Sequence, residues 1–442
     1  MNNNEAIRDA RKLGVPKMLI LGLQHMFAMF GATVLVPILV QSYGLPLSIQ
    51  TTLFFAGLGT LFFHICTRMK VPAFLGSSFA FLGGFSTVAT LPAYEGVDPQ
   101  TKLAYALGGV VVAGLLYLVL ALVIKLVGVK KVMRFLPPVV TGPIIILIGL
   151  NLAPSAVANA STCWWLAIVS IIIIVVANIW GKGMIKIIPI LLGVVGSYIV
   201  AVIANLCGAN LIDFSGVASS QIVGLQPFAL AKFDINAILV MAPIAIAAMM
   251  EHIGDMSAIS ATVGENFIED PGLHRTLIGD GIATSLAGLF GGPANTTYGE
   301  NTGVLVLSKV HDPRVIRLAA IYALVLSFSP AFAAIINSIP AAIIGGVSFI
   351  LYGMISAIGV RNIVENNVDL TNSRNLIIAA VILVCGLGFS NGLTFYIGST
   401  AITLTSLAIA AIAGIVLNAI LPGKDYEFGT NPEGDQNRGV HH

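Results

Sequence analysis

The sequence predicts an all-α polytopic membrane protein with fourteen membrane-spanning segments, arranged as two inverted repeats of seven segments. Of its 442 residues, 57% are hydrophobic and only 10% are charged, whereas about a quarter of the residues in soluble proteins are charged. Ten or more apolar runs approach or exceed the roughly 20 residues that a helix needs to cross a bilayer. In addition, three short sequence patterns recur in the same order in the two halves of the chain.

The spanning segments are predicted from the apolar runs between short polar loops. In the first half we expect segments at 18–40, 50–67, 71–93, 104–128, 137–153, 163–180 and 184–206. In the second half we expect segments at 236–258, 275–291, 293–308, 314–335, 339–360, 374–391 and 395–421. The tenth segment is polar and glycine-rich at its start, so hydropathy alone does not identify it.

The distribution of basic residues supports counting the tenth segment. With the N-terminus placed inside and the segments alternating, all but Lys102 and Lys232 of the 22 lysines and arginines fall on the inner side. A missing or extra segment would move every later loop to the other side and scramble this bias. Both termini are therefore expected in the cytoplasm, and the polar tail 422–442 is expected to be disordered.

The internal repeat points to a binding site. The matching pairs are Gln24-His25 with Glu251-His252, Gly76-Ser-Ser-Phe79 with Asn295-Thr-Thr-Tyr298, and Pro137 and Gly142 with Pro340 and Gly345. An odd number of segments per repeat inverts the second copy. In secondary transporters of this kind, interrupted segments at corresponding positions mark a binding site near the membrane midplane. Segments 3 and 10 are that pair.

Three carboxylates within predicted segments are candidates for a functional role, because an ionised side chain is costly in a membrane and usually functional. These are Glu251, Asp255 and Glu300. Glu251 and Asp255 are four residues apart and share a helix face, so two like charges disfavour joint ionisation and one proton is expected to be held there. The alternative is a structural polar pair with His252, His25 or the backbone. For Glu300 the alternative is to accompany free backbone groups of the interrupted segment.

Other polar and aromatic residues in the segments have structural and functional interpretations. His25 and His252 lack a third ligand at metal-site spacing, so structural hydrogen bonding is preferred and no metal or cofactor is expected. Asp280 either supports the carboxylates of segment 8 or is buried and paired. Phe79 and Tyr298 could flank a planar ligand or simply pack. A nucleophile paired with a base is not visible, so an enzyme is not expected, and the scattered basic residues make a nucleic-acid partner improbable.

Several motifs resemble one transporter family. The run Asn295-Thr-Thr-Tyr-Gly-Glu-Asn301-Thr-Gly303, followed by Ser308-Lys309, resembles the signature of the nucleobase-ascorbate transporter family, and is closest to its bacterial uracil-transporting members. Further matching stretches extend across nearly the whole chain: Gln24-His25 with Phe27 to Thr33, Pro72 to Phe81, Glu251 to Gly254, Asp270 to Arg275, and Gly345 to Gly353.

The resemblance implies a fold and a set of site residues. It implies short strands in segments 3 and 10, a core domain from 1–128 and 236–335, and a gate domain from 129–210 and 336–421. The implied substrate-binding residues are Phe79, Glu251, Gly299, Glu300 and Tyr352, to which the repeat adds Tyr298. Proton coupling is expected from Glu251, Asp255 and Glu300, with Gln24, His25, His252 and Asn301 in support.

The function implied is import of uracil with a co-transported proton across the bacterial cytoplasmic (inner) membrane, by alternating access of the core against the gate. Expected partners are the nucleobase and membrane lipid, with a possible homodimer through the gate domain. Glu300 favours a pyrimidine, because family members that take xanthine or urate commonly have Gln there. Asp255 stands where the best-known uracil-transporting members have His, so its role can differ. The alternatives are a xanthine or purine permease and, less favoured, an anion transporter of related fold, in which acidic site residues would be unexpected.

Overall fold

The computed structural model describes residues 6–397, 400–424 and 426, with only the backbone described for Glu300, Ile397, Thr400 and Ala401. Most of the predicted tail 422–442 therefore lies outside the described residues. The first half contains η1 (Ala10–Leu13), α1 (Val15–Ser42), α2 (Ile49–Cys66), β1 (Leu75–Ser77), η2 (Phe79–Phe81), α3 (Leu82–Thr90), η3 (Pro92–Tyr94), α4 (Pro99–Val127), α5 (Val129–Met133), α6 (Pro138–Leu150), α7 (Ala153–Ser161), α8 (Trp164–Trp180), α9 (Met184–Ile187), α10 (Pro189–Leu206) and α11 (Ser215–Ala218).

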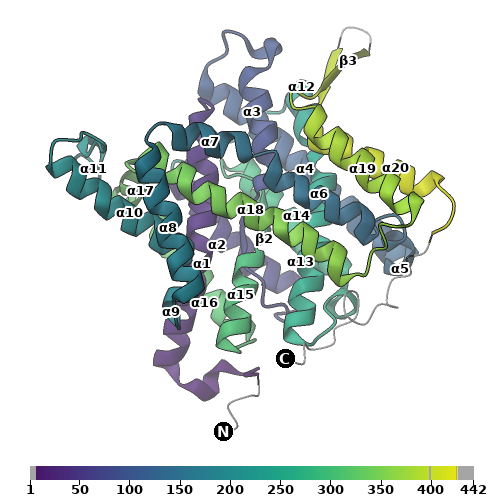
Figure 1. Cartoon of the computed structure of the whole chain (residues 1–442), viewed down its shortest axis with the longest axis horizontal. Helices are drawn as coiled ribbons and strands as arrows, with labels where there is room; N and C mark the ends of the chain where they lie inside the picture. Colours follow the sequence, from purple (N-terminus) through teal and green to yellow (C-terminus); the bar gives the residue numbers. More distant parts are fainter. Residues whose placement is uncertain (1–5, 398–399, 425, 427–442) are drawn as a thin grey trace.

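The second half is also mainly helical (Figure 1). It contains α12 (Ile235–Met241), α13 (Ile244–Val263), η4 (Ile268–Gly272), α14 (Leu273–Leu289), β2 (Asn295–Thr297), α15 (Gly299–Ser308), α16 (Pro313–Ser327), α17 (Pro330–Asn337), α18 (Ala341–Glu365), α19 (Ser373–Gly388), β3 (Leu393–Ile397), β4 (Thr400–Leu404) and α20 (Ser406–Ile420).

The predicted class, a helical protein that crosses the membrane many times, is confirmed. Within the described part of the chain, seven helical stretches are long and apolar enough to span a membrane, or eight if α16 and α17 count as one bent span. The remaining apolar helices, such as α8, α19 and α20, are shorter. The count of fourteen segments stays a prediction.

Two predicted segments differ in form from a single straight helix. The segment at 314–335 is bent by 88° between α16 and α17. Ser329 caps α17 by accepting a hydrogen bond from the Phe332 N–H, and Pro330 follows at the first helical position, where it cannot continue the preceding helix. The segment at 395–421 begins as a β3–β4 hairpin rich in Thr, Ile and aromatic residues, and its helix starts only at Ser406.

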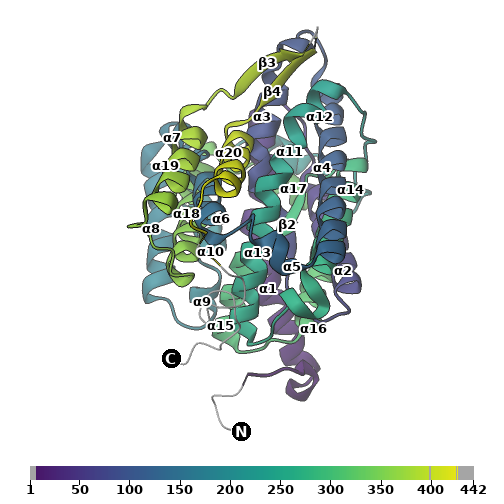
Figure 2. The same cartoon turned by 90° about the vertical axis from the view of Figure 1, so that its right-hand side faces the viewer.

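The helices pack in two groups, separated in Figure 2. In the first helix group, α14 packs against α4 and α2, and α16 packs against α2 and α1. In the second helix group, α18 packs against α6, α7 and α8, while α19 packs against α20 and α6. Small residues permit the closest approaches, as in membrane helix pairs generally. A Cβ on Gly281 of α14 would lie 2.6 Å from Tyr117 Cβ of α4, and one on Gly359 of α18 would lie 2.6 Å from the Gly142 carbonyl oxygen of α6.

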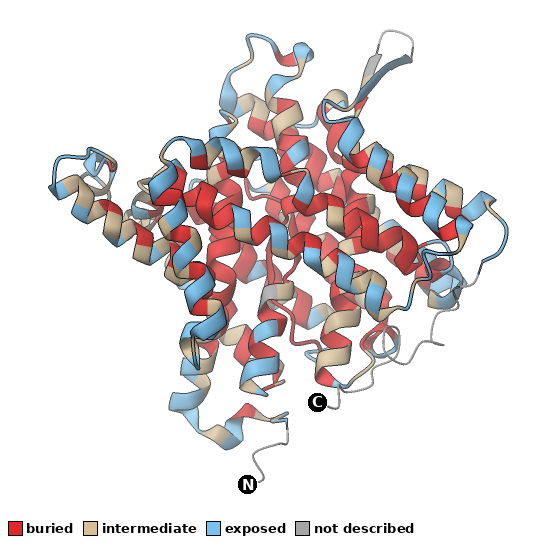
Figure 3. Cartoon of the chain, in the orientation of Figure 1, coloured by how far each residue is buried: buried red, intermediate tan, exposed pale blue. Residues whose placement is uncertain are grey.

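Burial is concentrated where the two helix groups meet, and the outward faces of peripheral helices such as α8 and α10 are exposed (Figure 3). Leu126 of α4, Leu206 of α10 and Val384 of α19 are each more than two-thirds exposed, although they are apolar. Exposed apolar side chains on long apolar helices are expected where the surrounding solvent is lipid.

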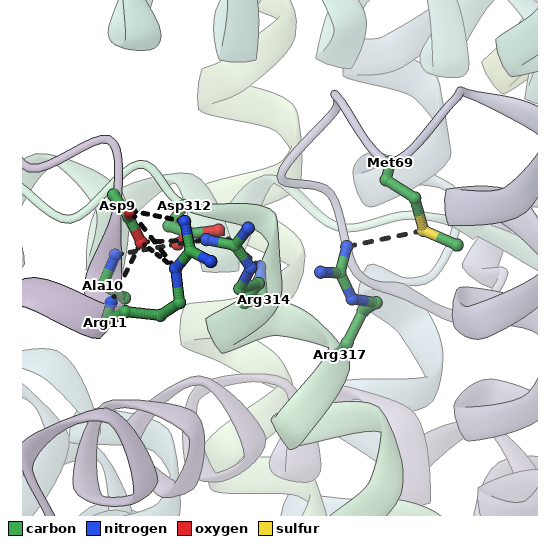
Figure 4. Close-up of polar contacts among 7 residues, drawn as sticks. All are labelled: Asp9, Ala10, Arg11, Met69, Asp312, Arg314 and Arg317. Atoms are coloured by element: carbon green, nitrogen blue, oxygen red, sulfur yellow. Dashed lines mark hydrogen bonds and ion pairs between the residues drawn. The ribbon is translucent and has the colours of Figure 1, made fainter. Parts of the chain in front are cut away.

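Residues 6–14, which we call the N-terminal strap, close over the end of the first helix group from which α1 starts. We call this end the N-terminal side. The Ile7 N–H donates to the Lys309 carbonyl (2.8 Å), and the Ala10 N–H donates to Asp312 Oδ2 (2.8 Å). Arg314 Nη1 lies 2.9 Å from Asp9 Oδ1, as Figure 4 shows. An ion pair between Arg8 and Glu265 joins the same strap to the loop after α13.

Candidate functional site

Two short antiparallel strands pair at the centre of the molecule. This strand pair, which we call the strand crossing, forms the floor of the candidate site. β1 and β2 pair antiparallel, with Leu75 opposite Thr297 and Ser77 opposite Asn295. The pairing extends by one bond at each end, from the Ser78 N–H to the Ala294 carbonyl (2.8 Å) and from the Tyr298 N–H to the Phe74 carbonyl (3.0 Å). These bonds satisfy backbone groups that could not otherwise lie unpaired inside a membrane protein. The strands expected in segments 3 and 10 are therefore present.

Each strand is attached to a neighbouring helix by one threonine, in the same way. The Leu75 N–H donates to Thr60 Oγ1 of α2 (2.8 Å), whose hydroxyl donates to the Ala56 carbonyl of its own helix (2.7 Å) and also lies 3.2 Å from the Leu75 carbonyl oxygen. The Asn295 N–H donates to Thr284 Oγ1 of α14 (3.1 Å), whose hydroxyl donates back to the Asn295 carbonyl (3.1 Å). Both threonines are fully buried. The first residue of each strand is thus held by matching contacts.

A helix begins directly after each strand. β1 leads into η2 and α3, and β2 leads into α15, which starts at Gly299. Neither η2 nor α15 has a side-chain cap at its start. The first N–H groups of a helix have no partner within the helix and carry partial positive charge, so both helix starts offer donors to a ligand at the strand crossing.

A small buried cavity of about 20 Å³ lies against the strand crossing. Of the predicted site residues, five line it: Phe79, Glu251, Asp255, Tyr298 and Gly299. The other lining residues are Thr296 and Thr297 of β2 and the aliphatic side chains Ile145, Ile355 and Ile358 of the second helix group. This volume holds about one water molecule, whereas ligand pockets usually measure about 300–1,000 Å³. The described conformation is therefore closed around the site.

The two carboxylates of α13 both line the cavity, as expected for residues four apart on a helix. Asp255 is 6% exposed, and its Oδ2 accepts a hydrogen bond from Thr297 Oγ1 (3.0 Å). A Cβ on Gly299 would lie 3.6 Å from Asp255 Oδ1, so the start of α15 lies close to this carboxylate. Glu300 is the second residue of α15, and its side chain lies outside the described part of the chain.

Tyr298 lines the cavity, but its hydroxyl is engaged in the strand crossing. Tyr298 Oη donates to the Ser77 carbonyl (2.9 Å), and its ring covers Gly76, where a Cβ would lie 2.3 Å from Tyr298 Cε2. Only glycine leaves room for this ring. Tyr298 can therefore offer a ligand its ring surface, while its hydroxyl holds β1 and β2 together.

The residues expected to support the site lie behind it. Asn301 Nδ2 of α15 lies 3.4 Å from both Nδ1 and the carbonyl oxygen of the fully buried His25 of α1. His252 points away from the cavity toward α14, where its Nδ1 lies 2.9 Å from Asp280 Oδ2 and its Nε2 lies 2.9 Å from Thr276 Oγ1. Gln24 does not line the cavity.

Phe79 separates the central cavity from a larger one on the side opposite the N-terminal strap. That outer cavity measures about 350 Å³ and is lined by Phe79 and residues of α3, together with residues of α6, α7, α19 and α20. Its lining includes Ser86, Thr87, Asn151 and Ser155, so the cavity is partly polar. The Phe79 ring packs edge-to-face on Tyr352 of α18, with centroids 6.0 Å apart.

Ile358 separates the central cavity from a third cavity, of about 40 Å³, on the N-terminal side. This inner cavity lies between α13 and the end of α18 and is lined by Ser257, Arg361, Asn362 and Glu365 among others. The central cavity thus shares one lining residue with each of the other two cavities. Phe79 borders both the outer and the central cavity, and Ile358 borders both the central and the inner cavity.

Several lining residues were not predicted from the sequence. Ile145, Ile355 and Ile358 are ordinary aliphatic residues in apolar runs and carry no sequence signal of a site. Thr296 was part of the repeated pattern but was not assigned a role. Its hydroxyl is buried and has no hydrogen-bond partner among the described residues, which leaves it available to a ligand.

Comparisons with known proteins agree with the sequence motifs. The sequence profile of the Permease family matches residues 16–395. The uracil permease of Bacillus caldolyticus is 40% identical over 433 residues, which cover 95% of this chain and 94% of that protein. The uracil permease of Bacillus subtilis (strain 168) is 39% identical, covering 90% and 91%. The putative pyrimidine permease RutG of Escherichia coli (strain K12) is 38% identical, covering 92% and 89%.

Solved structures share the fold at low sequence identity. The transmembrane domain of the cyanobacterial bicarbonate transporter BicA aligns with a TM-score of 0.63 at 15% identity, covering 94% of this chain and 99% of that one. SLC26A9 aligns with a TM-score of 0.66 at 10% identity, covering 93% and 66%. These two matches concern the fold alone. Because the family profile and the permeases match most of its length, the chain belongs to the nucleobase-ascorbate transporter family, a family of membrane permeases.

Proposed function

We propose that this protein is a symporter that imports uracil together with protons by alternating access. The names of its relatives support a uracil or other nucleobase substrate. The observation that carries the proposal is the central cavity, where two carboxylates, a free threonine hydroxyl, an aromatic ring and a helix start surround one small space.

The chemistry of this cavity suits a planar imide. Uracil presents two ring N–H donors and two carbonyl acceptors. Glu251 and Asp255 can accept from the ring nitrogens, while the Thr296 hydroxyl and the first N–H groups of α15 can donate to the carbonyls. Phe79 can lie against the ring face. An anionic substrate would instead be repelled by the negative charge that remains on this carboxylate pair, so we do not extend the cargo of the anion transporters that share the fold to this protein.

Proton coupling is proposed for the carboxylate pair of α13, with Glu300 as a third candidate from the start of α15. Two carboxylates on one helix face, both lining a cavity that holds about one water, are not expected to be ionised together. Thr297 donates to Asp255 Oδ2 and stabilises the charged form of Asp255. We propose that the two carboxylates of the pair share one proton.

For the movement we propose a core domain of residues 1–128 and 236–335 working against a gate domain of residues 129–210 and 336–421. The division is supported by the packing of the two helix groups. In this proposal the path runs through the outer, central and inner cavities, with Phe79 as the outer barrier and Ile358 as the inner one. The outer cavity, of about 350 Å³, is larger than the inner cavity, of about 40 Å³. We therefore assign the described conformation to a state whose central site is closed and whose outer cavity faces the side opposite the strap.

The inverted repeat and the orientation belong to the same proposal. The matching attachments of β1 by Thr60 and of β2 by Thr284 support two equivalent halves, because α2 and α14 occupy corresponding places in the predicted repeats. Fourteen segments and both termini in the cytoplasm follow from that arrangement. We further propose a homodimer through the gate domain, whose outer helices α8, α10 and α19 expose apolar surface.

Uptake of labelled uracil into proteoliposomes tests this function. We expect saturable uptake that follows an imposed inward proton gradient. Xanthine and adenine should compete with uracil only weakly. Uptake unaffected by collapsing the gradient would contradict symport, and stronger competition by xanthine would favour the purine alternative. Glu251→Gln should abolish proton-driven uptake, because an amide cannot take up and release the proton that the proposal assigns to the carboxylate pair. Glu269→Gln is the matched control, because Glu269 is exposed and does not line the cavity.

A further inference from the structure

An apolar groove of about 670 Å³ lies between the two helix groups, away from the substrate path. Residues of α1 and α16 of the first group and of α10 of the second form its walls, and α17 contributes the remainder. On α1 the lining positions 23, 26, 27 and 30, and on α10 the positions 191, 194, 195 and 198, repeat with helical spacing. One continuous face of each helix therefore borders the groove.

The helix geometry explains why the groove exists. α1 and α10 approach closely at Gly31, where a Cβ would lie 2.6 Å from Ile190 Cγ2. Beyond this point α10 runs away from α1 toward α11, as Figure 1 shows. The 88° bend between α16 and α17 leaves space between α16 and α10 that no other helix fills among the described residues.

The groove offers nothing polar to a ligand or to water. Its only two polar side chains are tyrosines, and both hydroxyls are already engaged. Tyr198 Oη pairs with Ser338 Oγ (2.6 Å), and Tyr322 Oη donates to the Leu19 carbonyl (3.2 Å). Val325 is 65% exposed and Ile335 is 41% exposed, so the groove is open to the surroundings of the protein. In helices of this apolarity those surroundings are lipid acyl chains.

Three basic residues precede the groove along α1 and α10, on the N-terminal side, toward which Figure 1 shows α9 and the start of α1. Lys17 precedes Leu23 on α1 by six residues, or about 9 Å of helix. Lys182 and Lys186 precede Leu191 in and before α9, which packs against α1. All three lysines are exposed, and none of them forms an ion pair with another described residue. The nearby carboxylates Asp9 and Asp312 are paired with arginines of the strap and of α16.

We propose that this groove binds one acyl chain of an anionic phospholipid, whose phosphate lies at Lys17 and Lys186. The apolar walls select the chain, and the lysines select the anionic headgroup. A chain in this position lies between α1 and α10, one helix from each group. If the groups move against each other as the proposed function requires, the bound lipid restrains that movement.

Native mass spectrometry of the full chain tests the site. The protein is reconstituted in bilayers of equal parts phosphatidylcholine and phosphatidylglycerol, then released into mild detergent, and retained lipids are counted. We expect wild type to retain one phosphatidylglycerol per chain. Val325→Trp and Ile335→Trp, which fill the groove from two walls, should each reduce retention about tenfold, the effect of about 1.4 kcal/mol. Val119→Trp on α4, also exposed but outside the groove, is the matched control.

A second pair of variants tests the headgroup. Lys17→Gln with Lys186→Gln should lower retention of phosphatidylglycerol relative to phosphatidylcholine, whereas Lys125→Gln with Lys130→Gln, also exposed, should not. Equal retention in wild type and both tryptophan variants would overturn the site and leave only bulk lipid. A change in oligomeric mass in those variants would instead assign the groove to a second copy of the chain, and would also overturn it. These readouts do not depend on uracil, so failure of the lipid site and failure of the proposed transport are distinguishable.

Discussion

The Phe79 ring of η2 meets the Tyr352 ring of α18 edge-to-face, with centroids 6.0 Å apart and an interplanar angle of 72°. This pair joins the two helix groups directly above the central cavity. Phe79 borders both the central and the outer cavity, so any ligand that passes from one to the other must displace this ring. The pair is therefore where binding and movement are expected to be coupled.

Tyr352→Ala should impair uracil transport more than uracil binding. An aromatic pair of this geometry is worth about 1 kcal/mol, so its loss changes the balance of open and closed states about fivefold, while the carboxylates proposed to bind the base stay in place. Comparison of equilibrium binding with initial uptake rates measures the two effects. Tyr352→Phe keeps the ring and should behave like wild type. Equal losses of binding and transport in the alanine variant would make Tyr352 an ordinary binding residue.

Asp255→Asn should move the pH dependence of uracil affinity toward lower pH. The substitution removes a like charge from the helix face that Glu251 shares, so Glu251 loses its proton more readily. Measuring affinity from about pH 5 to pH 9 detects the shift, because unperturbed carboxylates titrate near 4. Thr297→Val removes the hydrogen bond to Asp255 but keeps its charge, and should displace the profile in the opposite direction. Unshifted profiles in both variants would leave Asp255 as a structural residue.

Thr60→Val and Thr284→Val should each destabilise the protein, by similar amounts of about 1–3 kcal/mol. Valine has nearly the same shape but leaves the N–H of Leu75 or Asn295 buried without a partner. Thermal unfolding of the detergent-solubilised protein measures the effect. Thr90→Val is the matched control, because Thr90 is exposed and its hydroxyl bonds only to carbonyls of its own helix. A large loss in one threonine variant and none in the other would contradict the equivalence of the two strand attachments.

The N-terminal strap should release from α16 in acid. The Arg11 side chain, hydrogen-bonded to Asp9, holds the pKa of that carboxyl well below its usual range, and Arg314 adds to the effect. A carboxyl with a lowered folded pKa contributes stability above its unfolded value of about 3.9 and loses that contribution as the pH falls further. Amide hydrogen exchange at Ile7 and Ala10, corrected for intrinsic rates, should therefore be constant from pH 7 to about 5 and rise below about 4. Asp9→Asn should show the faster exchange at every pH.

Much of the site was predictable because its residues are polar or charged although the surrounding sequence is apolar. Carboxylates such as Glu251 and Asp255 in apolar runs, and polar glycine-rich breaks at segments 3 and 10, are costly in a membrane and so mark a site. Ile358 could not be distinguished from other aliphatic residues, because its role depends on which helix it faces. A single helical threonine such as Thr60 or Thr284 usually bonds within its own helix, so its contact with a distant strand also needs the structure.

The departures from the predicted helices have local causes that the sequence contains. Ser329-Pro330 within the segment at 314–335 is a cap and helix start, and it accounts for the bend. Asn391-Gly392 and the β-branched and aromatic run after it are typical of a strand, but their apolarity also fits a spanning helix. The sequence therefore predicts a spanning helix that begins at 395, and this prediction is wrong for 395–397 and 400–404, which lie in β3 and β4.

The N-terminal strap contacts two helices of the candidate site and can be reached by a reagent in the aqueous phase. It bonds to Lys309, at the end of α15, and through Arg8 to Glu265, just after α13. The start of α15 and the middle of α13 both line the central cavity. An antibody fragment directed at residues 6–14 would therefore grip both helices together without entering the membrane. Such a reagent could hold the protein in one conformation for imaging while the cavity stays free to be titrated with ligand.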